Sequence, residues 1–449
     1  MIQEYKKGNK IYKFIDDSVN YYENVFTVLV GKNGTGKSRL LGNLIRNNIN
    51  ESNNYYLKQK ELGFASCGEG VIKSTKKPAK IIAVSTSPFD KFPLQNLYKS
   101  RELNQDNYCY VGIRDLRHHN FSLAFMSKII GSLMNIAHYK QNQFFKISDV
   151  LNYLGYSDRI HASFDVQLTR RSFDELIANK KIPYEFEKLF ELRTRSNNRF
   201  FRNENNEIDV HKIEKIINIL NNFDDWRKKK YEITISVLGI DNIFDYQDFS
   251  FLVESGMLKL RNVGLKKLDS QNVFRISEAS SGEQCIFTTF LGIACEIQDN
   301  SLIFIDEPEI SLHPSWQEKY ITLLMTTFRS YKNCHFIIAT HSPQLISRLD
   351  TDNCFILKMD NSELKPAKEY INHSIDFQLA SIFNAPGYKN EYLNRLVFSI
   401  MAKIAKTKVF DQEDLSNYKI IESQISFMED NDPLKNLFYL LTDLKRKYA

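Results

Sequence analysis

A glycine-rich run near the N-terminus has the residue types and spacing of a phosphate-binding loop. Residues 31–38 read GKNGTGKS, between an apolar β-rich segment and a helix-like one, and these flanks disfavour a chance glycine-rich turn. Glycines let successive backbone amides and the helix N-terminus point at one phosphate. The pattern predicts that Lys37 bridges the β- and γ-phosphates of a nucleotide and that the Ser38 hydroxyl binds Mg²⁺. The other predicted phosphate-binding residues are Asn33, Gly34, Thr35, Gly36 and Arg39.

Two adjacent carboxylates follow a second apolar run, LIFI at residues 302–305. In α/β sheets ligands bind at the carboxyl ends of strands, and Asp306 and Glu307 stand at such an end. We expect Asp306 to hold Mg²⁺ through its water shell and Glu307 to orient or deprotonate the attacking water. Acidic residues at a strand end are often only solvated turn formers, but the phosphate loop in the same chain favours the catalytic interpretation.

A histidine follows a third apolar segment. His341 comes two residues after the strand-like His335–Ala339, which again places a polar group at the ligand-binding edge. We predict that His341 hydrogen-bonds the γ-phosphate and reports its presence. A lone histidine is more often structural, yet the position of this one in the order of motifs favours a functional role.

The elements that must position these residues are parallel strands meeting at one edge. Mainly apolar runs at 25–30, 81–84, 302–305 and 335–339 are typical of strands that are covered on both faces. Helix-like periodicity appears at 38–47 and 314–328, in a long stretch that includes 185–192 and 213–220, and again after 368. The pattern therefore predicts an α/β fold with additional helical regions.

Four regions follow from this pattern. We expect the phosphate loop in 1–115, a helical insertion in 116–230, the carboxylates and His341 in 231–367, and a helical, partner-binding region in 368–449.

The composition excludes several classes of protein. A hydrophobic content of 43% and a charged content of 25% over 449 residues are ordinary for a folded chain. The apolar runs are far shorter than the roughly 18 residues of a membrane span, and the first residues lack the apolar core of a secretory signal. We therefore expect a cytoplasmic protein without membrane contact. The net charge of +6 permits a nucleic-acid partner without predicting one.

A fourth motif suggests a family. Residues 278–284 read EASSGEQ, which matches a helix capping box and also resembles the signature loop of ABC-type ATPases. The order of phosphate loop, signature, carboxylates and histidine is similar to that of ABC-type ATPases, whose domain is a mostly parallel sheet with flanking helices. The resemblance implies ATP and Mg²⁺ as cofactors and a homodimer with ATP at its interface. The residues it assigns to the γ-phosphate held by the other subunit are Ser280, Ser281, Gly282 and Glu283.

The amino-acid sequences of three segments resemble a narrower group of ATPases. IDEPEISLHPSWQ, ATHSPQLIS and VSTSPFDKFP look like the ABC-type ATPases of bacterial antiphage defence, which include overcoming-lysogenization-defect proteins and the PtuA ATPase of Septu and of some retrons. No acidic nuclease cluster follows His341, which favours a PtuA-like protein. The PtuA resemblance implies an HNH-type nuclease partner and, in retrons, a reverse transcriptase with its RNA and DNA. One departure is that Ser85, Thr86 and Ser87 stand where many ABC ATPases place a Mg²⁺-contacting glutamine.

Three functions remain open from the sequence. The first is an ATP-driven dimeric switch that regulates an associated nuclease. The second is a scaffold that holds nucleotide without turnover, and the third is a RecF-like DNA-repair ATPase.

Overall fold

The chain folds around three β-sheets in the part that the computed structural model describes. It divides into two compact units, Met1–Asp115 with Glu296–Ala449 and Leu116–Cys295. The described residues are 1–50, 70–94, 107–112, 114, 121–167, 200–203, 207–222, 230–269, 273–310, 312–349, 352–371 and 373–448. In this part of the chain no helix is long and apolar enough to cross a membrane.

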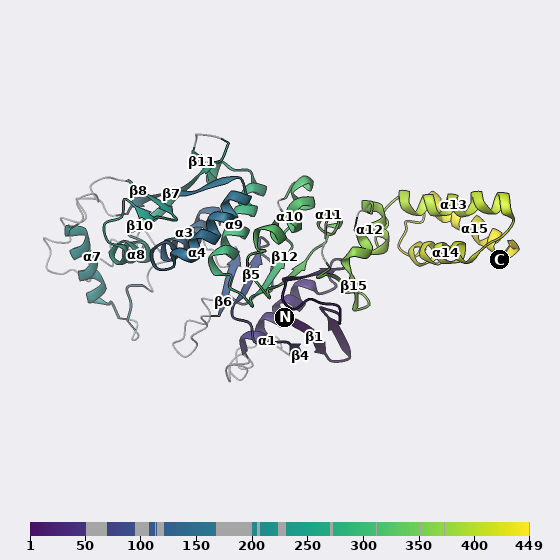
Figure 1. The fold of residues 1–449 in the computed structure, drawn as a ribbon, viewed down its shortest axis with the longest axis horizontal. Helices are drawn as coiled ribbons and strands as arrows, with labels where there is room; N and C mark the ends of the chain where they lie inside the picture. Colours follow the sequence, from purple (N-terminus) through teal and green to yellow (C-terminus); the bar gives the residue numbers. More distant parts are fainter. Residues whose placement is uncertain are drawn as a thin grey trace. The chain divides into compact units, whose positions relative to one another are not determined.

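A seven-stranded sheet forms the centre of the first unit, with the order β15-β14-β3-β13-β12-β5-β6. Its strands β5, β6, β12 and β15 are labelled in Figure 1. All neighbouring pairs are parallel except β14 with β15. The strands are β3 (Val25–Val30), β5 (Ile81–Ser85), β6 (Tyr108–Gly112), β12 (Leu302–Asp306), β13 (His335–Ala339), β14 (Cys354–Lys358) and β15 (Glu363–Pro366). Every residue of β3, β5, β12 and β13 is buried, as expected of parallel strands covered on both faces. This part of the fold confirms the α/β prediction.

Alternate residues of these strands enter two different layers. Leu29, Phe304 and Ile337 pack in one core cluster with α1 (Lys37–Asn50) and with the small antiparallel sheet of β1 (Ile2–Lys7), β2 (Lys10–Lys13) and β4 (Val71–Ser74). On β13 the residue before Ile337, Phe336, instead stacks with Phe26 and contacts Phe328, the C-cap residue of α10 (Pro314–Thr327). The parallel sheet is therefore sandwiched, and only its edges remain free for chemistry.

The C-terminal helices of the first unit have a core of their own (Figure 1). After α11 (Pro343–Ile346) and α12 (Ile375–Ser381), the chain forms α13 (Glu391–Thr407), α14 (Gln412–Ile425) and α15 (Pro433–Tyr448). Val397, Ile400 and Ile404 recur at three- and four-residue spacing on α13 and pack with residues of α14 and α15. Side-chain caps begin α13 and α14, so these helices are locally well specified.

The second unit is built on a five-stranded antiparallel sheet, β11-β10-β7-β8-β9. Its strands are β7 (Tyr156–Val166), β8 (Lys230–Ser236), β9 (Gly239–Asp241), β10 (Leu258–Lys267) and β11 (Val273–Arg275). Its described helices are α3 (Phe121–Tyr139), α4 (Gln141–Tyr153), α7 (Val210–Asn222), α8 (Tyr246–Glu254), the short η3 (Ile276–Glu278) and α9 (Ser281–Glu296).

The expected helical insertion at 116–230 is shorter than this unit, and the unit contains a β-sheet as well as helices. The unit continues to Cys295, and β7 is an 11-residue strand within the stretch interpreted as helical. In β7, Ile160, Ala162 and Phe164 alternate with less buried residues, a period of two that the surrounding helix-like pattern obscured. The predicted helix at 213–220 lies in α7, whereas the one predicted at 185–192 falls outside the described residues.

Candidate active site

The topology brings three of the predicted motifs to one edge of the central sheet. Strands β3, β13, β12 and β5 are neighbours and parallel, so the segments that follow them leave the sheet at the same side. Within the first unit, His341 contacts both Lys37 and Glu307, and Ser38 contacts Asp306. The two sets of contacts are joined along the chain, because Ser38 follows Lys37 and Glu307 follows Asp306.

The phosphate loop lies between β3 and α1. Gly34 and Gly36 have φ angles of 82° and 93°, in the left-handed region where a side chain is disfavoured. Leu40 N donates to the Gly36 carbonyl at 2.8 Å, so the helix begins directly after the second of these glycines. The helix N-terminus and the amides of the bent loop form a concavity suited to a phosphate group.

Lys37 crosses the inside of this loop and is almost fully buried. Its Nζ donates to the carbonyls of Gly31 at 2.8 Å and Lys32 at 3.2 Å, and lies 3.2 Å from His341 Nδ1. Burial lowers the pKa of Lys37 to about 8, an effect that nearby carboxylates, first of all Glu307, oppose. The ammonium form therefore still predominates at neutral pH, and it is the form that attracts a phosphate.

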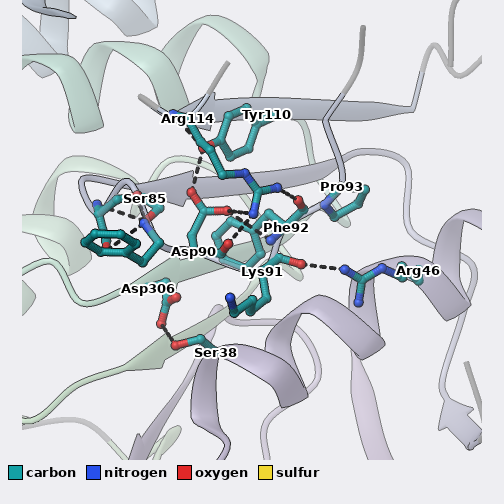
Figure 2. Close-up of polar contacts among 12 residues, drawn as sticks. Ser38, Arg46, Ser85, Asp90, Lys91, Phe92, Pro93, Tyr110, Arg114 and Asp306 are labelled. Carbon is teal, nitrogen blue, oxygen red and sulfur yellow. Dashed lines mark hydrogen bonds and ion pairs between the residues drawn. The ribbon is translucent and has the colours of Figure 1, made fainter. Parts of the chain in front are cut away.

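Ser38 and Asp306 form the second contact across the edge, shown by a dashed line in Figure 2. The Ser38 hydroxyl donates to Asp306 Oδ1 at 3.0 Å. Burial raises the pKa of Asp306 to about 7; the Ser38 hydrogen bond opposes this rise, and the neighbouring carboxylates, including Glu307 and Asp90, add to it. A divalent cation would relieve this concentration of negative charge.

The donor set fits Mg²⁺ better than a metal held by protein ligands alone. Among the described residues no group of three or more His, Cys, Asp or Glu side chains is arranged to hold a metal. Mg²⁺ commonly takes one or two protein oxygens and completes its octahedron with water and substrate phosphates. The Ser38 hydroxyl and the Asp306 carboxylate supply such oxygens.

Glu307 has an unusual backbone. Its φ is 49°, in the left-handed region that non-glycine residues rarely adopt, while its N–H donates to the Ala339 carbonyl at 2.9 Å. Strained conformations of this kind are commonly found at functional sites. Glu307 Oε1 lies 3.4 Å from His341 Nε2, and the two side chains are 27% and 30% exposed, so both remain accessible from solvent.

His341 stands between the lysine and the glutamate. Burial lowers the pKa of His341 to about 4, and the nearby Lys37 charge adds to this effect. The ring is therefore neutral at physiological pH. A neutral ring that accepts from Lys37 at Nδ1 carries its proton on Nε2, where it faces Glu307.

Glu309 belongs to the same cluster, although we assigned it no role from the sequence. Its Oε1 accepts from the backbone N–H of His341 at 2.6 Å. Glu309 is half-buried, but its Oε2 is shielded from solvent and has no hydrogen-bond partner of good geometry among the described residues. The only sequence signal was its place in the DEPE run, three residues after Asp306.

The segment at the end of β5 is the one in which the sequence has Ser85, Thr86 and Ser87 in place of the expected Mg²⁺-contacting glutamine. Ser85 pairs in register with Asp306 on the neighbouring strand, so its hydroxyl is at the same edge. That hydroxyl accepts from Ser87 N at 3.1 Å, while Thr86 Oγ1 donates to the Glu307 carbonyl at 3.5 Å. These contacts place the serine and threonine side chains beside the carboxylates; a role for them in Mg²⁺ binding remains a prediction.

A buried network fixes this loop from the other side, as Figure 2 shows. Asp90 accepts from the Tyr110 hydroxyl at 2.6 Å and from Phe92 N at 3.0 Å, and lies 3.4 Å from an Arg114 nitrogen. Arg46 from α1 donates to the Lys91 carbonyl at 2.6 Å. Sequence reasoning quoted Asp90 within VSTSPFDKFP but assigned no role to it or to its partners.

The signature residues begin α9 in the second unit. Ser280 N and Oγ donate to Glu283 Oε2 at 3.0 and 2.9 Å, and Glu283 N donates back to Ser280 Oγ at 3.3 Å. This is the predicted capping box. Ser280 and Ser281 are exposed, while Gly282 is buried. A capped helix N-terminus with exposed hydroxyls is chemically suited to an anion.

The chain is similar to a known protein family and to a curated protein. Residues 155–347 match the family described as "AAA domain, putative AbiEii toxin, Type IV TA system", a match that includes the signature, both carboxylates and His341. The retron Ec83 probable ATPase of Escherichia coli is 33% identical over 123 residues. That alignment covers 24% of this chain and 22% of the relative, so the chain spans about a fifth of the length of the relative it matches.

Several solved structures resemble the chain weakly. Stu0660 of Streptococcus thermophilus superposes with a TM-score of 0.34 at 11% identity, covering 98% of this chain and 100% of that one. The Smc head domain bound to the C-terminal domain of ScpA from Pyrococcus furiosus gives 0.28 at 12% identity, with coverages of 81% and 95%. MJ1267, an ATP-binding cassette of an ABC transporter in its ADP conformation, gives 0.28 at 13%, with coverages of 84% and 92%.

The assignment of the fold depends on the chain's own topology and motifs. The parallel strands, the phosphate loop between β3 and α1, and the carboxylates after β12 form one connected edge. The chain therefore has the α/β fold of a P-loop ATPase.

Proposed function

We propose that the chain binds ATP with Mg²⁺ and hydrolyses it to ADP and phosphate. The observation that carries this proposal is the connected cluster of Lys37, Ser38, Asp306, Glu307 and His341 at one edge of the parallel sheet. Each residue has a side chain suited to one part of phosphoryl transfer. Together they supply a phosphate-binding lysine, oxygen ligands for Mg²⁺ and a residue that positions water.

The roles follow from the geometry. Lys37, with the loop amides around Gly34 and Gly36, binds the β- and γ-phosphates and offsets the charge that develops during transfer. Ser38 and Asp306 would hold Mg²⁺, which when bound would supply positive charge to stabilise the nucleotide's phosphates. Glu307 orients or deprotonates the attacking water, and the neutral His341 donates from Nε2 to the γ-phosphate or to Glu307.

A second copy of the chain is part of the proposal. Glu307 and His341 remain about a quarter to a third exposed, which leaves the γ-phosphate side of the edge open. The exposed, capped start of α9 offers Ser280, Ser281, Gly282 and Glu283 as the complementary surface from the other subunit. The homodimer thus closes around two nucleotides and reopens after hydrolysis or release.

We place this ATPase in the cytoplasm, in a PtuA-like antiphage defence system, where its dimeric state regulates an HNH-type nuclease partner. The AbiEii-type family match, the 33% identical segment of a retron ATPase and the DEPEISLHP wording support this context. In a retron-type system a reverse transcriptase with its RNA and DNA joins the assembly. The region 368–449 is the proposed partner-binding surface, because Phe398, Tyr439 and Leu440 are more than half exposed there.

The decisive experiment is phosphate release from ATP-Mg²⁺ by the purified full chain. We expect turnover by the wild type and its loss in Glu307→Gln, with nucleotide still bound. Binding without turnover in the wild type would instead support the nucleotide-held scaffold. Stimulation of turnover by DNA alone would favour a RecF-like repair ATPase, and efficient cleavage of nucleic acid without a second protein would contradict the nuclease-partner proposal.

A further inference from the structure

Glu309 makes a contact that joins the ends of two neighbouring strands. It lies just after β12, while its hydrogen-bond partner, the N–H of His341, lies just after β13. The 2.6 Å distance between Glu309 Oε1 and that nitrogen is at the short end for a charge-assisted N–H···O bond. This contact holds the His341 amide itself, between Thr340, whose N–H donates to the Leu29 carbonyl at 3.1 Å, and Ser342, whose hydroxyl donates to Gln317 at 2.6 Å.

The ring position depends on that backbone. His341 Nδ1 is 3.2 Å from Lys37 Nζ, and Nε2 is 3.4 Å from Glu307 Oε1. A displacement of about 1 Å at the His341 backbone would remove one or both contacts, because hydrogen bonds weaken steeply beyond about 3.5 Å. Neither Lys37 nor Glu307 contacts the His341 backbone in the described hydrogen bonds, and Glu309 is the side chain that holds the His341 N–H directly.

The Glu309 carboxylate is expensive to keep for stability alone. Burial raises its pKa, against opposing hydrogen bonds from the backbone of His341 and of Glu309 and from the Thr340 side chain, and Oε2 has no hydrogen-bond partner of good geometry among the described residues. A buried polar atom that lacks a partner costs about 1–3 kcal/mol. An apolar side chain of similar size avoids that cost, so a functional reason for the carboxylate is needed.

We propose that Glu309 is a positioning residue for ATP hydrolysis, whose buried carboxylate holds the His341 backbone so that the ring stays between Lys37 and Glu307. This inference rests on the proposed function. Glu309 itself touches neither nucleotide nor water in this role; it acts through His341. Loss of Glu309 therefore slows the chemical step while nucleotide binding through the phosphate loop persists.

The test compares Glu309→Ala with Glu309→Gln in the full chain. The alanine variant loses the acceptor, and we expect its kcat to fall roughly 10- to 100-fold with KM for ATP-Mg²⁺ little changed. The glutamine variant keeps an acceptor of the same length, and we expect its kcat to stay within about 3-fold of the wild type. Glu214→Ala, the same change at an exposed glutamate of α7, is the matched control and should leave kcat unchanged.

Two further measurements separate positioning from a purely structural role. The melting temperature of Glu309→Ala should equal or exceed that of the wild type, because a buried carboxylate has been removed; a fall in both melting temperature and kcat would overturn the proposal. Hydrogen exchange of the peptide containing His341 in nucleotide-free protein should accelerate in Glu309→Ala and not in Glu309→Gln. Equal exchange in all three proteins would also overturn it.

The possible failures are distinguishable. A wild type that binds ATP without hydrolysing it would remove the proposed function and this inference together. An active wild type with an equally active Glu309→Ala would remove the inference alone. If Glu309→Ala does not fold, Glu309→Leu, which fills more of the site, replaces it; failure of both to fold would assign Glu309 a structural role and overturn the proposal.

Discussion

Two lysines of the first unit, Lys37 and Lys403, contact oxygen atoms in very different surroundings. Lys37 is nearly buried at the edge of the parallel sheet, donates to two backbone carbonyls, and has a pKa lowered to about 8 by burial. Lys403 on α13 lies 2.5 Å from Asp411 Oδ2 and 3.4 Å from Asp414, and the Asp411 hydrogen bond raises its pKa. One charge is desolvated, whereas the other is satisfied by local partners.

The contrast extends to the segments around each lysine. The sheet edge contains a left-handed glutamate, a buried carboxylate oxygen without a described partner of good geometry, and an Asp306 carboxylate whose pKa is raised by burial and by its neighbouring carboxylates. The C-terminal helices instead have N-caps, a capping box and a periodic apolar core. Unfavourable local chemistry that is retained in a fold points to function, whereas satisfied local chemistry points to stability.

The largest effect should separate the two lysines directly. Lys37→Ala removes the only side-chain ammonium that we place on the phosphates, so we expect ATP-Mg²⁺ affinity to fall at least about 100-fold. Lys403→Ala should leave affinity unchanged. Isothermal titration with a non-hydrolysable ATP analogue measures both, and similar losses in the two variants would erase the distinction between the regions.

Glu307→Gln sharpens the comparison by removing chemistry without removing binding. We expect kcat to fall roughly 10²- to 10⁴-fold, since an amide neither deprotonates nor properly orients the water. The affinity for ATP-Mg²⁺ should stay within about 3-fold of the wild type. Single-turnover hydrolysis measures the rate of the chemical step, and equilibrium binding measures the affinity for ATP-Mg²⁺. A variant that hydrolyses ATP at the wild-type rate would mean that the water is activated elsewhere.

Ser280→Arg tests whether the sheet edge is completed by another subunit. The added bulk and charge at the exposed start of α9 should leave ATP binding to the monomer intact while preventing the closed dimer. Turnover should therefore fall by about 10-fold or more. Light scattering with ATP-Mg²⁺ in a Glu307→Gln background reports the dimer. A fully active Ser280→Arg protein would show that the site is not shared.

The smallest effect belongs to the C-terminal helices. The Asn390 side chain accepts from Leu393 N at 3.0 Å and donates to the Pro386 carbonyl at 2.8 Å, capping α13. We expect Asn390→Ala to lower the free energy of unfolding by about 1–2 kcal/mol, with kcat unchanged. Urea unfolding and phosphate release measure these quantities. A large loss of activity would show that the bundle's local stability controls the sheet edge.

Contiguous motifs allowed much of the site to be predicted. The phosphate loop has a local cause, since glycines, a lysine and a serine must follow a strand and begin a helix. The apolar strands 302–305 and 335–339 predicted that Asp306, Glu307 and His341 would leave one edge. The structure brings Asp306 to Ser38 and His341 to Lys37 within hydrogen-bonding reach, and it brings Glu307 to His341. Their chemical roles remain predictions.

The remaining features depend on contacts between distant segments. Glu309 meets the His341 backbone 32 residues away, and Asp90 meets Tyr110 and Arg114, which sequence patterns alone do not link. The strand β7 was missed because its alternation of buried and exposed residues lies in a charged, helix-like stretch. Such features follow from tertiary packing, which overrides local propensity.

The left-handed backbone of Glu307 has a consequence for engineering the protein. Glycine adopts φ near 49° without steric conflict, so a glycine at position 307 would relieve local strain that the native residue tolerates. Heat resistance and turnover therefore oppose each other at this position. A selection for thermal tolerance alone would favour an inert chain, whereas a selection that also demands ATP turnover would keep the strained acid.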